Sequence, residues 1–527
     1  MSKQSERSSR AKTKKHMKTS KKNKIIIIIS VVVLVLVCFC YFAYVTGLPA
    51  KVLPGAKIVH TVDGKEKTVD RISIVEMNYY YSTTLSQYTS YGIIGANADL
   101  DAVYNSNNGQ TYRQMLWETA ANNAQTQYLL GEAIKSSGFK PVAAERYAED
   151  QLDSIRESAD YMNTLRGTNM TTDQYLQNMY GPGMTVQIMR KILYRQAMID
   201  EFRAYVQQTT FLPDQAKVQE EFDNNKDKYT FCRFQIYFVS ADMPTDATDE
   251  QKKELMDAAM EKAKMITDDC ANAVEFQTKV KLVCTDEYRT RMLDGEDPTS
   301  KSGMNKEQLK SYSEEFAEMC FNPETKPNTS MVFVDKDNTG VFAALFEEVY
   351  IEDEPTCAYR VLSLTDDVLG DISNTLEQKA PSHQKLHAEA EGYMSQVTSE
   401  DKFIELVKKY SSDSASYLAG GYKSGVKASS FEANAVVTKE GEEAKLPEED
   451  QKLIDWLYDP ARKKGDMYII DCVDSVKLYY FCDSMAAYQD LIRTNLTGEN
   501  FTTWYNATIS DSSYSTVVNH GLIDFFT

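Results

Sequence analysis

The longest apolar stretch of the chain lies close to its start. Ile25 to Val45 contains no charged side chain, and about twenty residues is the length at which an α-helix crosses a hydrocarbon core of roughly 30 Å. Ten lysine and arginine residues precede it, against the single acid Glu6. This bias predicts a cytoplasmic tail (residues 1–24), a single-pass transmembrane anchor (25–45) in the cell membrane of what we expect to be a bacterium, and an extracytoplasmic remainder.

A cleaved secretory signal is the alternative interpretation of this segment. Such signals usually have an apolar stretch of 7–15 residues that ends in small residues at the cleavage site. The residues from Tyr44 to Gly47 fit that pattern poorly. An uncleaved anchor is therefore the favoured prediction.

Beyond the anchor, apolar positions recur at helical spacing as far as Lys228. A hairpin around Asp63-Gly64, a favoured turn pair, comes before this region. Together they predict a mainly helical domain over residues 50–229. Within it, the run Tyr79, Tyr80 and Tyr81 has two interpretations, because these aromatic side chains either pack in a core or line a cradle for apolar peptide.

From Thr230 the pattern changes to short β-rich strings that alternate with helices, and it occurs twice. Each copy has a strand, helices and a terminal hairpin, and the hairpins that begin at Met331 and Met467 align without gaps. An aspartate follows the second helix in both copies, Asp286 and Asp413. The sequence predicts two tandem α+β domains, 230–352 and 356–485. A C-terminal helix and tail (486–527) are too short to bury a core and should return to the helical domain.

Charge and cysteine content narrow the possible functions. The formal net charge is −19, and since the tail carries about +9, the remainder carries about −28, which argues against a nucleic-acid partner. The seven cysteines after the anchor show no CxxC spacing. Buried free thiols are favoured over disulfides, although pairing of some of them stays open.

Three segments together resemble a known class of proteins. They are the hairpin from Val62 to Lys65 with the helix after it, the joining helix from Leu212 to Tyr229, and the stretch from Lys402 to Asp413 followed by Gly420-Gly421. These look like the extracytoplasmic foldases of the SurA and PrsA type. The resemblance implies a helical chaperone domain, two parvulin-type prolyl isomerase domains, and a C-terminal helix that completes the chaperone domain.

Prolyl isomerase activity makes specific demands on these domains. Rotation about an X-Pro amide has a barrier near 20 kcal/mol, and polar groups must relieve the conjugation of that amide. The resemblance implies two histidines, on the first and last strands, beside a cysteine or an aspartate. Asp286 and Asp413 match the acid, but the first-strand histidine position falls at Gln235 and Arg360.

The last-strand histidine position is also occupied by other residues. It falls near Phe342 and Leu478, and none of the five histidines of the chain lies in these strands. The aspartates alone are weak evidence, because an isolated aspartate after a helix is usually a capping or turn residue. We therefore name no catalytic residue.

A metal site is not expected either. His383 and His387 are four residues apart on one predicted helix, but no third ligand accompanies them. No phosphate-binding glycine loop or nucleophile elbow is present in the sequence. The sequence predicts no cofactor and no metal.

These observations favour a membrane-anchored chaperone or foldase whose partners are unfolded or newly exported polypeptides. Its parvulin-like domains would be weak or inactive as isomerases. Two alternatives stay open: an active peptidyl-prolyl cis-trans isomerase with an unusual residue set, and a cell-envelope assembly or scaffold protein that binds one fixed partner.

Overall fold

The computed structural model describes residues 31–35, 47–435 and 444–526. The predicted tail and most of the predicted anchor, Ile25 to Val45, lie outside these residues, so the anchor stays a prediction. In the described part of the chain, no helix is long and apolar enough to span a membrane. The described residues form helices and antiparallel sheets, in agreement with the predicted α+β class.

The chain forms two compact units. Unit 1 comprises Met1–Val206, Asp413–Ala419 and Phe501–Thr527, and unit 2 comprises Gln207–Ser412 and Gly420–Asn500. Unit 1 contains most of the predicted helical domain, and unit 2 contains nearly all of both predicted α+β domains.

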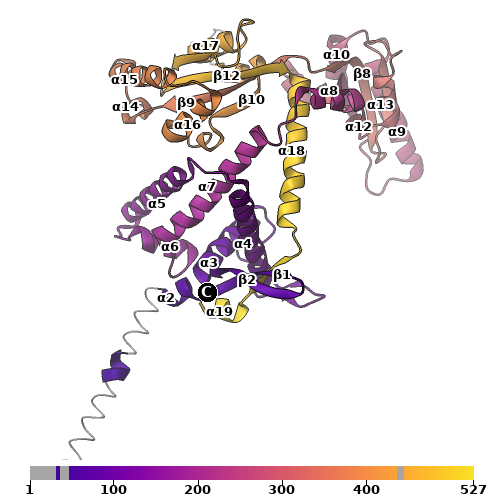
Figure 1. Ribbon diagram of the computed structural model, residues 1–527. Helices are drawn as coiled ribbons and strands as arrows, with labels where there is room; N and C mark the ends of the chain where they lie inside the picture. Colours follow the sequence, from indigo (N-terminus) through magenta and orange to yellow (C-terminus); the bar gives the residue numbers. More distant parts are fainter. Residues whose placement is uncertain (1–30, 36–46, 436–443, 527) are drawn as a thin grey trace, which may run out of the picture. The chain divides into compact units, whose positions relative to one another are not determined.

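A small antiparallel sheet in unit 1 joins the hairpin that begins at Pro54 to a strand of the C-terminal segment. Its strand order is β13-β1-β2, with β1 at Pro54–Val62, β2 at Lys65–Ser73 and β13 at Tyr514–Val518. The turn between β1 and β2 is at Asp63-Gly64 as predicted, and both residues have positive φ angles of 52° and 69°. The C-terminal segment returns to this domain, as expected, through β13 and through α19 beside β1 (Figure 1).

The helices of unit 1 are defined by clear local signals. Thr111 and Thr171 each form a capping box at a helix start, and Gly138 and Gly167 end helices in the left-handed conformation. The helices are α2 (Leu48–Val52), α3 (Ile74–Ser90), α4 (Tyr112–Ser137), α5 (Ala144–Arg166), α6 (Thr172–Tyr180), α7 (Val186–Gln208, of which unit 1 contains the part to Val206), the end of α18 (Ala487–Ile509) and α19 (His520–Phe526), with a short hairpin of β3 (Val103–Asn105) and β4 (Gln110–Thr111).

Unit 2 contains two four-stranded sheets with one topology. Their strand orders are β6-β5-β8-β7 and β10-β9-β12-β11, so in each the first strand lies between the second and the last. This identity supports the internal repeat. The strands are β5 (Thr230–Ser240), β6 (Ser300–Met304), β7 (Ser330–Val334) and β8 (Gly340–Ile351) in the first repeat, and β9 (Pro355–Leu364), β10 (Tyr422–Lys427), β11 (Met467–Asp471) and β12 (Val476–Ala486) in the second.

The helices also recur at equivalent places along the chain. Two longer helices follow the first strand in each repeat, and another helix comes before the last hairpin. They are α9 (Asp249–Thr267), α10 (Ala273–Val283), α11 (Asp286–Leu293), α12 (Lys306–Leu309) and α13 (Glu314–Phe321), and then α14 (Asp367–Gly370), α15 (Leu376–Met394), α16 (Glu400–Tyr410) and α17 (Glu448–Leu457), with α8 (Gln215–Asn224) before the first repeat.

The sheet register refines the predicted alignment of the repeats. Gln235 on β5 pairs with Leu345 on β8, and Arg360 on β9 pairs with Tyr480 on β12. The ungapped alignment instead matches Leu345 with Phe481. It holds within each hairpin but is one residue out relative to the first strand, and since neighbouring residues face opposite sides of a sheet, this offset decides which side chain lies beside Gln235 or Arg360.

All seven cysteines in the described residues are buried and free. Cys232 and Cys320 belong to one core cluster of the first repeat, and Cys270 and Cys284 belong to another. In the second repeat, Cys357 lies on β9, Cys472 directly follows β11, and Cys482 lies on β12. This state agrees with the favoured prediction of buried free thiols.

Candidate functional site

The aromatic run on α3 lies mainly in the core of unit 1. Tyr79 and Tyr80 are 7% and 4% exposed, and burial raises the pKa of Tyr80 to about 12. Tyr81 is half-buried, and its ring stacks on that of Trp117 with 4.1 Å between centroids. Of the two interpretations of this run, the burial of Tyr79 and Tyr80 agrees with packing in a core, and Tyr81 is only partly covered.

Gln235 in the first repeat is buried within a network of side-chain hydrogen bonds. Only 2% of it is exposed. Its Nε2 donates to Oε1 of Glu347 at 2.7 Å, and its Oε1 accepts a hydrogen bond from the hydroxyl of buried Thr299. Both ends of the amide are satisfied, which is the requirement for burying such a group at low cost.

Arg360, at the equivalent position of the second repeat, is held by charge. It is 3% exposed, and its Nε donates to Oε1 of Glu400 at 2.9 Å. Its other nitrogens donate to the carbonyl oxygen of Gly420 and to Oε1 of Gln208, at 3.2 and 2.9 Å. The guanidinium also lies over the Tyr422 ring, 5.0 Å from its centroid. These contacts occupy the group on several sides and fix its position.

Glu400 carries the opposite charge of this cluster. It is the first residue of α16, and its Oε2 also accepts from Nζ of Lys464 at 2.7 Å. Burial by itself would raise the pKa of Glu400, but the Lys464 hydrogen bond and the Arg360 charge outweigh burial and hold the pKa below its usual value. Glu400 is therefore a stable carboxylate at neutral pH.

A cysteine also lies in this cluster. The Cys482 Sγ is 3.7 Å from Oε1 of Glu400. Burial raises the pKa of Cys482 to about 12. Since the thiolate is the nucleophilic form, this thiol is unreactive at neutral pH.

The residues opposite Gln235 and Arg360 on the last strands are Leu345 and Tyr480. The positions expected from the sequence, Phe342 and Leu478, pair instead with Phe238 and Leu362. No histidine lies at any of these positions. A pair of imidazoles therefore cannot form across either sheet.

The two aspartates take local structural roles. Asp286 is the first residue of α11, its side chain is 97% exposed, and its Oδ1 accepts from Arg289 at 2.9 Å. Asp413 lies in a turn, where it accepts hydrogen bonds from the hydroxyl of Ser416 and the backbone N–H of Ala415. Both are the third residue after the equivalent helix of their repeat. In the first repeat, exposed Asp286 and buried Gln235 do not form a common site.

The histidine pair on α15 does not form a metal centre. His387 Nδ1 is 2.9 Å from Oδ1 of Asp471, whereas Nδ1 of His383 is buried without a partner. Among the residues described by the structure, no group of three or more His, Cys, Asp or Glu side chains is placed to hold a metal ion.

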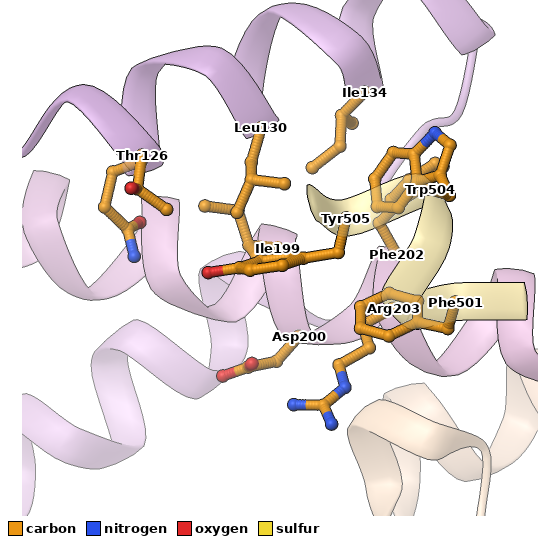
Figure 2. Close-up of a pocket in the computed structure, with 11 residues that line it drawn as sticks. Thr126, Leu130, Ile134, Ile199, Asp200, Phe202, Arg203, Phe501, Trp504 and Tyr505 are labelled. Carbon is orange, nitrogen blue, oxygen red and sulfur yellow. The ribbon is translucent and has the colours of Figure 1, made fainter. Parts of the chain in front are cut away.

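The structure reveals an aromatic pocket in unit 1 that the sequence did not indicate. It has a volume of about 310 Å³ and lies between α4, α7 and the end of α18. Figure 2 shows the ring of Tyr505 between Leu130 and Asp200, with Phe501 beside Arg203. The lining residues are Thr126, Gln127, Leu130, Ile134, Ile199, Asp200, Phe202, Arg203, Phe501, Trp504 and Tyr505.

Four aromatic rings form one side of this aromatic pocket. Trp504 lies 5.8 Å from Phe202 and 5.7 Å from Phe501 between ring centroids, and Phe501 lies 5.9 Å from Tyr505. Because Phe501, Trp504 and Tyr505 are spaced three and four residues apart, they share one face of α18. That spacing was the available sequence signal, but it does not reveal the partner helices.

Polar groups lie at the edge of the aromatic pocket. The guanidinium of Arg203 is 5.0 Å from the Phe501 ring centroid, a cation–π distance. Asp200 is exposed overall, but burial of its carboxylate raises its pKa. The nearby positive charge of Arg203 partly offsets this rise. The side-chain oxygen of Gln127 is buried without a hydrogen-bond partner. The aromatic pocket therefore offers apolar walls, an acceptor and two charges of opposite sign.

Comparisons with known proteins add no assignment. No protein-family model matches the chain, and no curated protein matches its sequence.

Proposed function

We propose that this protein is a membrane-anchored extracytoplasmic chaperone that binds unfolded exported polypeptides through unit 1. The aromatic pocket carries the proposal. Its volume, about 310 Å³, is at the lower end of the roughly 300–1,000 Å³ of ligand pockets, which are mostly apolar with a few polar groups. An apolar side chain of a client would enter between the rings.

The polar edge of the aromatic pocket suits a peptide ligand. The unpartnered oxygen of Gln127 is an acceptor for a backbone N–H that lies next to the inserted side chain. Asp200 and Arg203 at the edge tolerate charged neighbours of either sign. Such a site selects an apolar side chain of the client and places few requirements on the residues beside it. A protein with many clients needs this kind of selectivity.

The predicted anchor gives this activity a location. A chaperone tethered by Ile25 to Val45 stays near the point where exported chains emerge, and tethering raises its effective concentration there. We propose that the two repeats serve as non-catalytic arms, since Gln235 and Arg360 are engaged by internal partners.

Peptide binding by two matched variants tests this proposal. Tyr505→Ala removes a ring of the aromatic pocket, whereas Tyr161→Ala removes a tyrosine that is 66% exposed on α5, outside it. The probe is a fluorescein-labelled, permanently unfolded peptide rich in Phe and Leu, and fluorescence anisotropy measures its binding to the detergent-solubilised chain. Losing an apolar contact of about 1–2 kcal/mol should weaken binding roughly 5- to 30-fold in Tyr505→Ala only.

Two outcomes would contradict the proposal. Unchanged binding by Tyr505→Ala would place the client elsewhere, and equal losses in both variants would indicate a general effect on unit 1. Circular dichroism and suppression of client aggregation, measured on the same samples, separate lost binding from lost folding.

A further inference from the structure

Two cysteines of the first repeat lie in one small core. Cys232 on β5 is 0% exposed and Cys320 on α13 is 1% exposed. Both belong to the cluster that packs α12 and α13 against one face of the sheet, together with Phe234, Ile236 and Phe316. The two residues are 88 positions apart in sequence, so only the tertiary structure brings them into one cluster.

The neighbouring phenylalanines show how β5 faces α13. The rings of Phe234 and Phe316 meet edge to face, 5.3 Å between centroids. Cys232 is two residues before Phe234 and so lies on the same face of the strand, about 7 Å along it. Cys320 is four residues after Phe316 and so lies on the same face of the helix, about 6 Å along it. The interface that joins the two rings therefore extends to both thiols.

The thiols are in contact with each other. A hydrogen bond between the side chains of Cys232 and Cys320, together with burial, raises the pKa of Cys320. Thiolate is therefore scarce in the folded domain, and exchange with an external disulfide should be slow there. Oxidation is expected during folding, before the cluster closes.

Other cysteines that share a cluster differ from this pair. Cys357 and Cys472 both lie in the core beneath α17, but the Cys357 Sγ donates to the carbonyl oxygen of Leu457 at 3.4 Å. Cys270 donates to the carbonyl oxygen of Asn272 at 3.6 Å. Cys232 also lies within reach of a backbone acceptor, the carbonyl oxygen of Arg233 at 3.6 Å. What sets the pair apart is that Cys320 has a second thiol, that of Cys232, as its side-chain partner.

We propose that Cys232 and Cys320 form a disulfide that links β5 to α13 when the protein folds in an oxidising compartment. The oxidant is a small-molecule disulfide such as oxidised glutathione. One cysteine thiolate attacks it to give a mixed disulfide and releases one glutathione thiolate. The second cysteine thiolate then displaces the other glutathione, so one protein S–S bond forms, two S–H protons are lost, and the oxidant is reduced to two thiols.

The link would act on the stability of the first repeat and does not depend on the proposed chaperone function. A disulfide that closes a long segment reduces the conformational freedom of the unfolded chain. The first repeat would then be more stable in an oxidising compartment than in a reducing one. The second repeat would not change, because its cysteines lack this arrangement.

Mass spectrometry of refolded protein tests the proposal. The full chain in detergent is unfolded in urea, refolded in a mixture of reduced and oxidised glutathione, alkylated with iodoacetamide and digested. We expect one peptide pair joined through Cys232 and Cys320, absent after dithiothreitol, with the five other cysteines of the described residues alkylated. Alkylation of both Cys232 and Cys320 in the refolded wild type would overturn the proposal. A disulfide between either of them and a different cysteine would also overturn it.

Variants and melting temperatures complete the test. Cys270→Ser should keep the linked peptide, whereas Cys232→Ser and Cys320→Ser should each lose it. The oxidised wild type should melt roughly 5–10 °C above its reduced form in the transition of the first repeat. This comparison needs no variant, so it stays informative if a serine substitution prevents folding. Equal melting temperatures would refute the stabilising link.

Discussion

The two repeats place different chemistry at one position of the same sheet. Gln235 and Arg360 are almost equally buried, at 2% and 3% exposure. Gln235 is satisfied by two partners, one on β8 and one just before β6. Arg360 is satisfied by side chains of α16 and α7 and by a carbonyl oxygen just before β10. The sheet determines that the position is buried, and the side chain then determines how many segments must converge on it.

The stability of the two repeats depends to different degrees on these buried polar side chains. A buried amide with both ends paired contributes modestly, whereas a buried charge is costly unless its partners stay in place. The second repeat is therefore the one in which a single substitution should have a large effect.

Arg360→Ala should destabilise the second repeat by about 3–5 kcal/mol, because it leaves Glu400 without its buried partner. The matched change Gln235→Ala should cost the first repeat only about 1–3 kcal/mol. Alkylation rates of buried thiols in low urea report each repeat separately, Cys482 for the second and Cys284 for the first. Equal acceleration in the two variants would remove the proposed distinction.

Gly421→Ala should destabilise the second repeat by about 2–3 kcal/mol. Gly421 has a φ of +69°, and an added Cβ would lie 2.1 Å from the carbonyl oxygen of Val361. Gly392→Ala is the control, since nothing lies within 4 Å of its added Cβ and alanine favours α15 by roughly 0.5–1 kcal/mol. Urea unfolding of both variants checks the signs, and a stable Gly421→Ala protein would show that the turn can rearrange.

Acid should weaken the second repeat through Glu400. Because the folded-state pKa of Glu400 is lowered from about 4.5, the stabilisation is present above that value and is lost as the pH falls through the folded pKa. In Glu400→Gln this part of the pH dependence should disappear. With Trp117 and Trp504 replaced by Phe, the fluorescence of Trp456 in the second repeat follows its urea midpoint from pH 6 to pH 3. An identical pH slope in Glu400→Gln would contradict the assignment.

Asp413→Ala and Asp286→Ala should have the smallest effects. Asp286 is exposed and Asp413 accepts a hydrogen bond within its own turn, and neither sheet carries a histidine pair. Client binding should be unchanged in both variants, and proline-peptide isomerisation by the wild type should be close to the uncatalysed rate. Robust wild-type turnover that collapses in either variant would instead support the isomerase alternative.

Local sequence was sufficient for the features that depend on neighbouring residues. The Asp63-Gly64 turn forms as predicted because both residues tolerate positive φ. Threonine at position 111 and glycine at position 138 bound α4 by capping its ends. The repeat was also visible, since two copies of one strand and helix order in sequence produced two sheets with one strand order.

Tertiary structure decided the features that depend on distant residues. The sequence pattern could not tell whether Tyr79 and Tyr80 face a core or a cradle, because packing by α6 and α7 determines their burial. The aromatic pocket joins residues near 130, 200 and 504, and no local pattern encodes that meeting. The contact of Cys232 with Cys320 has the same origin. Capping and turns involve a few adjacent residues, whereas pockets and buried partners arise only when long-range packing brings separate segments together.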